Sequence, residues 1–221
     1  MRKWLGLIAC FGLMALPAAA QFKGGDSPSF EIGGGFAYRA FNAQTAPNVY
    51  GPPASEPRIP MNGWFVTVGY NFNGFLGVVS DIDWTRANVP NNLGLPGDDT
   101  VSSVMVGPQI YPIGHHRLTP FAHVEFGLAH ESENITNTME AADNGGCGTA
   151  ASLLPCTLTD GSFGVAAGGG LDVSLTHSFA VRLGEFDWEQ TRMFQPGPAY
   201  GNSNQSNWKV KAGIIVRFGG K

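Results

Sequence analysis

Two short patterns in the chain combine residue types that can do acid–base chemistry. Asp81 and Asp83 stand two positions apart, and a pair of carboxylates can act as general acid and base or hold a metal ion. His130 and Ser132 have the same spacing and are the types used as base and nucleophile. The sequence adds no zinc-type Cys and His spacing, phosphate-binding loop or nucleophile elbow to either pair. We therefore interpret Asp81 and Asp83 as interior polar residues and expect no cofactor and no metal ion.

Both pairs lie in or beside segments that alternate with a period of two, which is typical of β-strands with two different faces. In residues 63–72 one face carries small or neutral residues, including Thr67, Gly69 and Asn71, and is predicted to line a narrow interior. The other face is bulky and is predicted to meet lipid: Trp64, Val66, Val68, Tyr70 and Phe72. Seven further segments alternate in this way: residues 29–41, 76–84, 102–111, 119–130, 162–175, 178–189 and 207–218.

The segment over residues 178–189 breaks the alternation. Leu183 and the apolar residues before it share one face, but Phe186 and Trp188 have the opposite parity. A β-bulge inserts one extra residue into a strand and restores the parity. We predict a bulge near Gly184 and Glu185.

The connections between the segments alternate in length. Three are tight turns, and four are long and rich in Asn, Pro, Gly, Ser and Thr: residues 43–60, 86–100, 131–161 and 190–206. Short turns at one end and long loops at the other are typical of outer-membrane barrels. Charged residues make up 14% of the chain, against about 25% in soluble domains. The sequence predicts an all-β fold, an eight-stranded antiparallel up-and-down transmembrane β-barrel.

Aromatic residues gather at both ends of the bulky face. Trp and Tyr are enriched at membrane interfaces because their rings have an apolar body and a polar edge. We predict one belt at the long-loop end and one at the turn end. The first belt contains Trp64, Trp84, Trp188 and Trp208, and the second contains Phe30, Phe72, Tyr111, Phe179 and Phe218.

The opposite face of the strands carries charges of both signs. Parity, corrected for the bulge, assigns the following residues to the lumen: Glu31, Arg39, Asp81, Asp83, Glu125, Asp172, Arg182, Asp187, Glu189, Lys209, Lys211 and Arg217. Eight strands enclose a space that side chains just fill, and buried charges persist when they are paired. We predict a lumen closed by ion pairs, in which Arg39 or Arg182 contacts Asp81, Asp83 or Asp187. The alternative is a narrow path for ions or small solutes.

The N-terminus has the layout of a secretory signal peptide. A basic start, an apolar run over residues 4–16 and three alanines predict cleavage before Gln21. The predicted division is a signal peptide at 1–20 and an outer-membrane barrel domain at 21–221. Cleavage leaves 11 basic and 17 acidic residues, a net charge of −6, which argues against a nucleic acid as partner.

The cysteines carry two further hypotheses. Residues 7–10 match a lipobox, so lipidation of Cys10 is the alternative to its removal with the signal peptide. Cys147 and Cys156 lie in one polar, Gly-containing segment, and in an oxidising exported compartment they are predicted to form a disulfide.

Four stretches together resemble a known family: GWFVTVGYNFNGFLGVVSDID, LTPFAHVEFGLAH, GVAAGGGLDVSLTHSFAVRLGEFDW and KAGIIVRFG. They are similar to small, single-domain, porin-like outer-membrane barrels with an eight-stranded domain like that of outer membrane protein A. The resemblance implies a place in the outer membrane with the N- and C-termini in the periplasm. It also implies insertion by the barrel-assembly machinery, with Phe218 in the place of the usual terminal aromatic residue.

For function, we expect a non-enzymatic structural or surface-interaction role with a closed lumen. The expected partners are outer-membrane lipid, lipopolysaccharide, the barrel-assembly machinery and an extracellular ligand of the loops, and the chain is expected to be a monomer. One alternative is a narrow channel for ions or small solutes. The other is a lipid A-modifying enzyme, because His130 and Ser132 resemble the His-x-Ser motif of barrel lipid A deacylases. In that motif an Asn usually follows the Ser, whereas Glu133 stands here.

Overall fold

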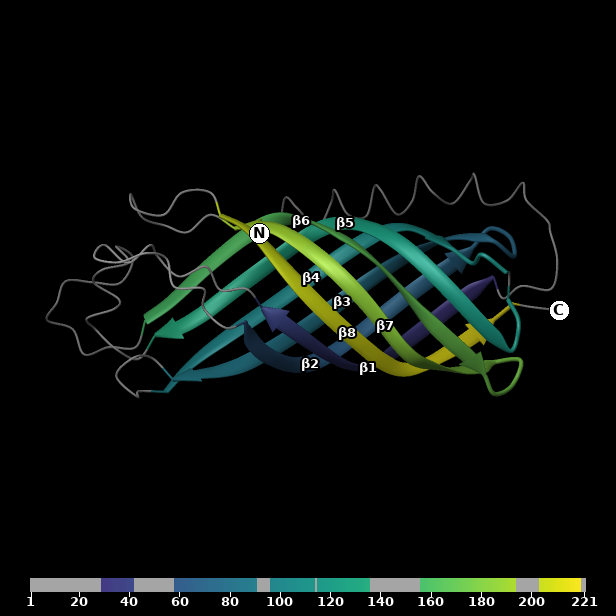
Figure 1. Ribbon diagram of the computed structural model, residues 1–221, viewed down its shortest axis with the longest axis horizontal. Coiled ribbons are helices and arrows are strands. Elements are labelled where there is room, and N and C mark those ends of the chain that lie inside the picture. The colour runs from purple at the N-terminus through teal and green to yellow at the C-terminus, as the bar shows by residue number, and fades with distance from the viewer. Residues whose placement is uncertain are drawn as a thin grey trace, which may run out of the picture.

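The computed structural model describes residues 29–41, 58–90, 96–113, 115–135, 156–193 and 203–219. They form eight strands that close into one barrel in chain order (Figure 1). The strands are β1 (Phe30–Phe41), β2 (Ile59–Asn71), β3 (Leu76–Pro90), β4 (Pro96–Ile110), β5 (Leu118–Ile135), β6 (Cys156–Ser174), β7 (Phe179–Met193) and β8 (Ser203–Phe218). None of the described residues belongs to a helix long and apolar enough to cross a membrane.

Every strand pairs antiparallel with the next one, and β1 also pairs with β8. Phe30 therefore lies opposite both Tyr70 of β2 and Phe218 of β8. Closure leaves no sheet edge, so the backbone of each strand finds its hydrogen bonds within the barrel. The predicted eight-stranded up-and-down barrel is confirmed.

The short turns lie at one end of the barrel, beside the first described residue and the last (Figure 1). In the turn between β2 and β3, the Asn73 side-chain oxygen accepts hydrogen bonds from the backbone N–H groups of Phe75 and Leu76, at 2.8 and 2.9 Å. Ser29 Oγ donates to the carbonyl oxygen of Gly219 at 3.2 Å and so ties the start of β1 to the end of β8. We call this the turn end and the opposite end the long-loop end.

The strands continue farther toward the long-loop end than the sequence pattern indicates. The predicted loop over residues 86–100 is wrong, because Arg86 pairs with Thr100 and the β3–β4 ladder continues to Pro90 and Pro96. The Arg86 guanidinium lies 2.5 Å from the Asp98 carboxylate and joins the two strands on their outer side. Asn, Pro and Asp suggested a loop, but pairing between neighbouring strands overrides that local preference.

The predicted loop over residues 131–161 is wrong in the same way at both of its ends. β5 runs to Ile135 and β6 begins at Cys156, and these two residues lie opposite each other. The polar residues at the long-loop ends of β5 and β6 therefore belong to paired strands rather than to a loop.

The two faces of β2 show the period of two in their exposure. Phe65 and Thr67 are only 1% and 3% exposed, whereas Trp64, the residue before Phe65, is 47% exposed. Thr67, Gly69 and Asn71 point inward, and the bulky residues between them point outward. Large apolar side chains thus cover the outside of the barrel, which is the arrangement a lipid solvent requires.

The predicted bulge in β7 is confirmed. Arg182 lies opposite Asp172 of β6, but Gly184 rather than Leu183 lies opposite Leu171, so β7 carries one extra residue. The register against β8 shifts at the same place, between Arg182 and Glu185. The extra residue turns Glu185 and the acidic residues after it toward the lumen.

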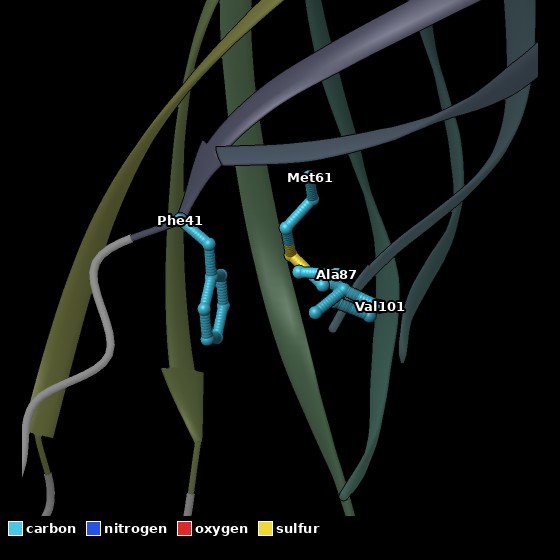
Figure 2. Close-up of a cluster of buried hydrophobic side chains, with 5 residues drawn as sticks. Phe41, Met61, Ala87 and Val101 are labelled. Carbon is cyan, nitrogen blue, oxygen red and sulfur yellow. The ribbon is translucent and has the colours of Figure 1, made fainter. Parts of the chain in front are cut away.

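The inside of the barrel carries an apolar cluster at the long-loop end (Figure 2). Phe41 ends β1, and its ring lies close to Met61 of β2 and the small residues of the next strands. The cluster contains Phe41, Met61, Ala87, Val101 and Ala129, and Ile59 packs against it.

Deleting Gly184 tests the bulge. The deletion removes the extra residue, so Leu183 comes to lie opposite Leu171 and Glu185 still lies opposite Gly170. The acidic residues of β7 then keep their inward direction, and we expect the chain still to fold as a barrel. The measurement is gel mobility of unboiled against boiled protein after refolding in detergent.

The matched control is Gly184→Ala. A Cβ atom at this position meets no other atom within 4 Å, so this variant keeps the heat-dependent mobility shift of the wild type. A deletion variant that loses the shift while the control keeps it contradicts the assignment of one extra residue to this position.

Candidate functional site

Among the residues that the structure describes, fourteen buried charged side chains lie in the lumen, none more than 5% exposed. Nine are acidic and five are basic. They are Glu31, Asp81, Asp83, Asp99, Glu125, Asp172, Glu185, Asp187 and Glu189, with Arg39, Arg182, Lys209, Lys211 and Arg217. Parity assigned all of these to the lumen except Asp99 and Glu185. Among the described residues this is the largest concentration of groups that can do chemistry, and we treat it as the candidate site.

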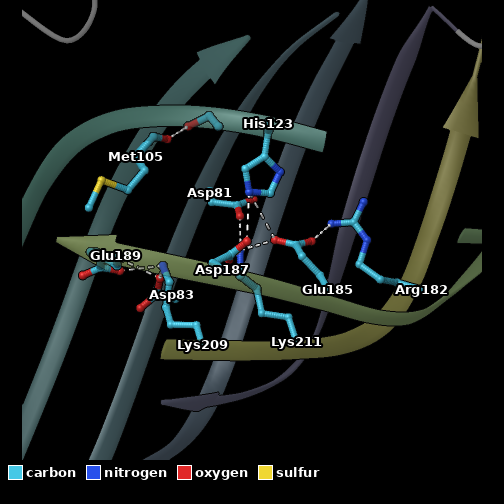
Figure 3. A network of polar contacts seen from close by, with 12 residues as sticks. Asp81, Asp83, Met105, His123, Arg182, Glu185, Asp187, Glu189, Lys209 and Lys211 are labelled. Atoms are coloured by element: carbon cyan, nitrogen blue, oxygen red, sulfur yellow. Dashed lines mark hydrogen bonds and ion pairs between the residues drawn. The ribbon is translucent and has the colours of Figure 1, made fainter. Parts of the chain in front are cut away.

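The first group of charges contains Arg39, which stands two positions before Phe41 of the apolar cluster, and it is balanced. Figure 3 shows three of its members, Asp83, Glu189 and Lys209. Arg39 reaches Asp83 at 2.5 Å and Glu189 at 3.2 Å. Lys209 Nζ lies 2.8 Å from the same two carboxylates. Ser103 Oγ adds a hydrogen bond of 2.6 Å to Asp83. Two cations and two anions thus form a closed square that joins β1, β3, β7 and β8.

The middle group is centred on Lys211 (Figure 3). Its ammonium group lies 2.5 Å from Glu185, 2.9 Å from Asp187 and in direct contact with Asp81. His123 of β5 contacts two of these carboxylates, Glu185 and Asp187, from the far side of β6. Its Nε2 atom lies 2.9 Å from Asp187 and 3.9 Å from Glu185.

The third group lies toward the turn end and contains two arginines. Arg182 pairs with Asp172 at 2.9 Å and also contacts Glu185 of the middle group. Arg217 pairs with Glu31 at 2.7 Å and lies 3.6 Å from Asp172.

Tyr111 completes this end of the lumen. Its hydroxyl donates to Glu31 Oε2 at 3.0 Å and accepts a hydrogen bond of 2.6 Å from Gln109. The His115 ring lies 4.1 Å from the Tyr111 ring, measured between ring centroids.

Several of these contacts cross the lumen rather than follow the sheet. Lys209 and Lys211 of β8 reach Asp83 and Asp81 of β3, although β1 and β2 stand between those strands. His123 of β5 reaches Asp187 of β7 past β6, which lies between these two strands. Opposite walls of the barrel are therefore bonded to each other through their side chains.

The pairing predicted for Arg39 with an aspartate is confirmed by its contact with Asp83. Arg182 instead pairs with Asp172 and Glu185. Sequence reasoning missed Glu185, because the bulge was placed on that residue and its parity was left unassigned. Parity assigned seven acidic and five basic residues to the lumen, whereas the described residues there include nine acidic and five basic ones.

Tyr111 corrects the predicted aromatic belt. The residue was assigned to the turn-end belt, but it is 1% exposed and points into the lumen. It shares its parity with Ser103 and Gln109, which also point inward, and that signal was available in the sequence. The Tyr111 hydroxyl donates a hydrogen bond to the buried Glu31 carboxylate and does not lie at the membrane interface.

The other belt residues lie on the outer face. Trp64, Phe179 and Phe218 are 47–49% exposed, and the rest are half-buried against their neighbours: Trp84, Trp188, Trp208, Phe72, and Phe30 at 37%. Trp188 Nε1 donates to Ser206 at 2.6 Å. Phe186 stacks on Trp208 with ring centroids 4.9 Å apart.

His130 and Ser132 both lie on the outer side of β5 near the long-loop end. His130 is exposed and Ser132 is half-buried. The Ser102 hydroxyl of β4 lies 3.5 Å from the His130 carbonyl oxygen. In the part of the chain that the structure describes, no hydrogen bond joins the His130 and Ser132 side chains.

The predicted signal peptide over residues 1–20, which contains Cys10, lies outside the described residues. Cys147 does too, whereas Cys156 opens β6. The disulfide between Cys147 and Cys156 stays a prediction.

The chain resembles solved outer-membrane barrels in fold. The attachment invasion locus protein Ail of Yersinia pestis shares 16% identity, with a TM-score of 0.53 over 87% of this chain and 99% of Ail. Neisserial surface protein A shares 13%, with a TM-score of 0.58 over 86% of this chain and 97% of that one. OprG of Pseudomonas aeruginosa shares 16%, with a TM-score of 0.52 over 88% and 98%. Identities this low show the shared fold alone.

Comparison by sequence gives the family. No curated protein matches the chain. The family described as outer membrane protein beta-barrel domain matches residues 6–218. Since this match spans nearly the whole chain, the protein belongs to the outer membrane protein β-barrel domain family.

Proposed function

We propose that the protein is a monomeric outer-membrane barrel with a lumen closed by ion pairs and a structural or surface-interaction role. Family membership supports the outer membrane as its location. The observation that carries the closed lumen is the square of Arg39, Asp83, Lys209 and Glu189, which spans the interior.

Ion pairs close a narrow lumen because they are costly to open. Removing one partner from a buried pair costs about 3–5 kcal/mol, since the other charge is left without compensation. A solute passing through this barrel meets three such groups in succession. It also meets the apolar cluster around Phe41 and Met61, which offers an ion no hydrogen bonds. Together these barriers favour a closed barrel over a channel.

The proposed orientation places the turn end in the periplasm. Ser29 and Gly219 lie at this end together with the short turns. Outer-membrane barrels keep short turns in the periplasm and long loops outside the cell. The Trp belt then lies in the outer leaflet, where lipopolysaccharide is its expected neighbour. Phe218 ends the last strand and is the residue that we expect the barrel-assembly machinery to read.

The proposed role is non-enzymatic. A nucleophile and its base must come within about 3 Å of each other. His130 and Ser132 share the outer side of β5 without such a contact, which supports a surface role for this pair. Mass analysis of lipid A after incubation with the folded protein checks this, and we expect no release of fatty acid. Release that is lost in Ser132→Ala contradicts the proposal.

Conductance in a planar bilayer tests the closed lumen. The wild-type barrel is expected to insert without discrete current steps, because no charge in the first and third groups is free to exchange with an ion. A double variant, Arg39→Ala with Phe41→Ala, removes part of the first group and of the apolar cluster and is expected to give small steps. Regular current steps from the wild type would show that the protein is a channel.

Arg39→Ala also tests how much the network contributes to stability. The variant leaves Asp83 and Glu189 with Lys209 as their shared cation, so we expect a loss of about 3–5 kcal/mol in the free energy of unfolding. The measurement is urea unfolding of the barrel in lipid vesicles.

Arg86→Ala is the matched control for this loss. Arg86 is also paired with an aspartate, but its side chain is 49% exposed on the outer side. The expected loss is at most about 1 kcal/mol. Equal losses in the two variants contradict the account.

A further inference from the structure

The three groups of lumen charges differ in their balance. The first group has two cations and two anions, and so does the third, with Arg182 and Arg217 against Asp172 and Glu31. The middle group has three carboxylates in contact with one ammonium group and one imidazole. The acidic excess among these three groups is therefore concentrated at one level of the barrel, where water is scarce and uncompensated charge is costly.

Glu125 raises this excess further. The residue is 1% exposed and stands two positions from His123 on the inner face of β5. Asp81, Lys211 and His123 of the middle group are among the charges that act on its carboxylate. Its Oε1 atom has no hydrogen-bond partner, and neither has His123 Nδ1. With Glu125, the middle group has four carboxylates and one lysine of its own, and Arg182 of the third group contacts only Glu185 among these four.

Three of these side chains already lie at the spacing of metal ligands. His123, Glu185 and Asp187 each offer one ligand atom, and these atoms lie within 4.8 Å of one another. Ligands of Zn²⁺ lie about 2.0–2.2 Å from the ion. A small contraction therefore brings all three atoms into its coordination sphere. One imidazole nitrogen with carboxylate oxygens is a ligand set that suits Zn²⁺ and related first-row cations.

We propose that the middle group is a binding site for one divalent first-row cation, held by His123, Glu185 and Asp187. On binding, Lys211 keeps its contact with Asp81 and turns from the two metal ligands toward Glu125. A cation of charge +2 lowers the negative excess of the middle group from three to one. The site lies within the closed part of the lumen, so the ion is expected to enter during folding and to hold β5 and β7 together. The inference is independent of whether the lumen conducts.

Metal content after refolding tests the proposal. Untagged, full-length chain is refolded into detergent micelles with ZnCl₂, and unbound metal is removed by gel filtration. We expect one zinc per folded barrel and a higher unfolding temperature than for protein refolded with a chelator, because an ion that binds only the folded state stabilises it. Cobalt(II) as a second probe is expected to bind without the absorption of a thiolate complex, which excludes the cysteines as ligands.

Three variants identify the site. His123→Gln and Glu185→Gln are expected to lose the bound zinc and the rise in unfolding temperature. Glu31→Gln removes a buried carboxylate from the third group and is expected to keep both. Should Glu185→Gln fail to fold, His123→Gln alone tests the site. This variant replaces the imidazole ligand with a neutral amide and leaves every carboxylate in place. Wild-type protein that retains no zinc would show that protons balance the charge, and zinc retained in His123→Gln would place it elsewhere; either result overturns the proposal.

Discussion

Charges that are enclosed by eight strands have to find their partners inside the barrel, on a neighbouring strand or across the lumen. The outside of the barrel is lipid, where an unpaired charge is expensive, and the inside is too narrow for bulk water. Lys211 shows the consequence, because its ammonium group contacts carboxylates of β3 and β7 from its place on β8. Those contacts need each strand to keep its parity and each wall to stand at a fixed distance from the opposite one.

The distance between the walls depends in turn on the small residues of β6. Gly168 lies opposite Asp187 in the register of β6 and β7. A Cβ atom at Gly168 would overlap the Asp187 carboxylate, which is the group that His123 contacts. The Gly- and Ala-rich inner face of β6 therefore leaves the room that the charged network of the neighbouring strands occupies. The glycines of β6 and the ion pairs of β7 are therefore linked, because a larger side chain at Gly168 would displace Asp187 from His123.

Parity in the sequence was sufficient to predict which face of each strand meets lipid and where β7 is irregular. Thr67 and Asp81 point inward as the alternation indicates, and the break at Leu183 marked the bulge. The partners of the charges were harder to predict, since parity says that Arg182 is inside but not which wall it meets. The partner of Arg182 depends on the relative shift of all eight strands along one another, and the sequence of one strand does not determine that shift. The sequence did not predict the strand ends beyond Arg86, because the residues there are turn-forming types. They nevertheless lie in strands, since β3 and β4 stay paired as far as Pro90 and Pro96.

A double-mutant cycle between Lys211 and Asp81 tests most directly whether contacts across the lumen hold the barrel. Lys211→Met, Asp81→Asn and the double variant are unfolded by urea in lipid vesicles, and the coupling free energy is taken from the cycle. The two residues lie on strands that do not pair, so their side chains are the direct link between them. The account predicts a coupling of at least about 1 kcal/mol, as is found for residues within one ion-pair network. A coupling indistinguishable from zero would contradict it, because the barrel would then owe its closure to the backbone ladder alone.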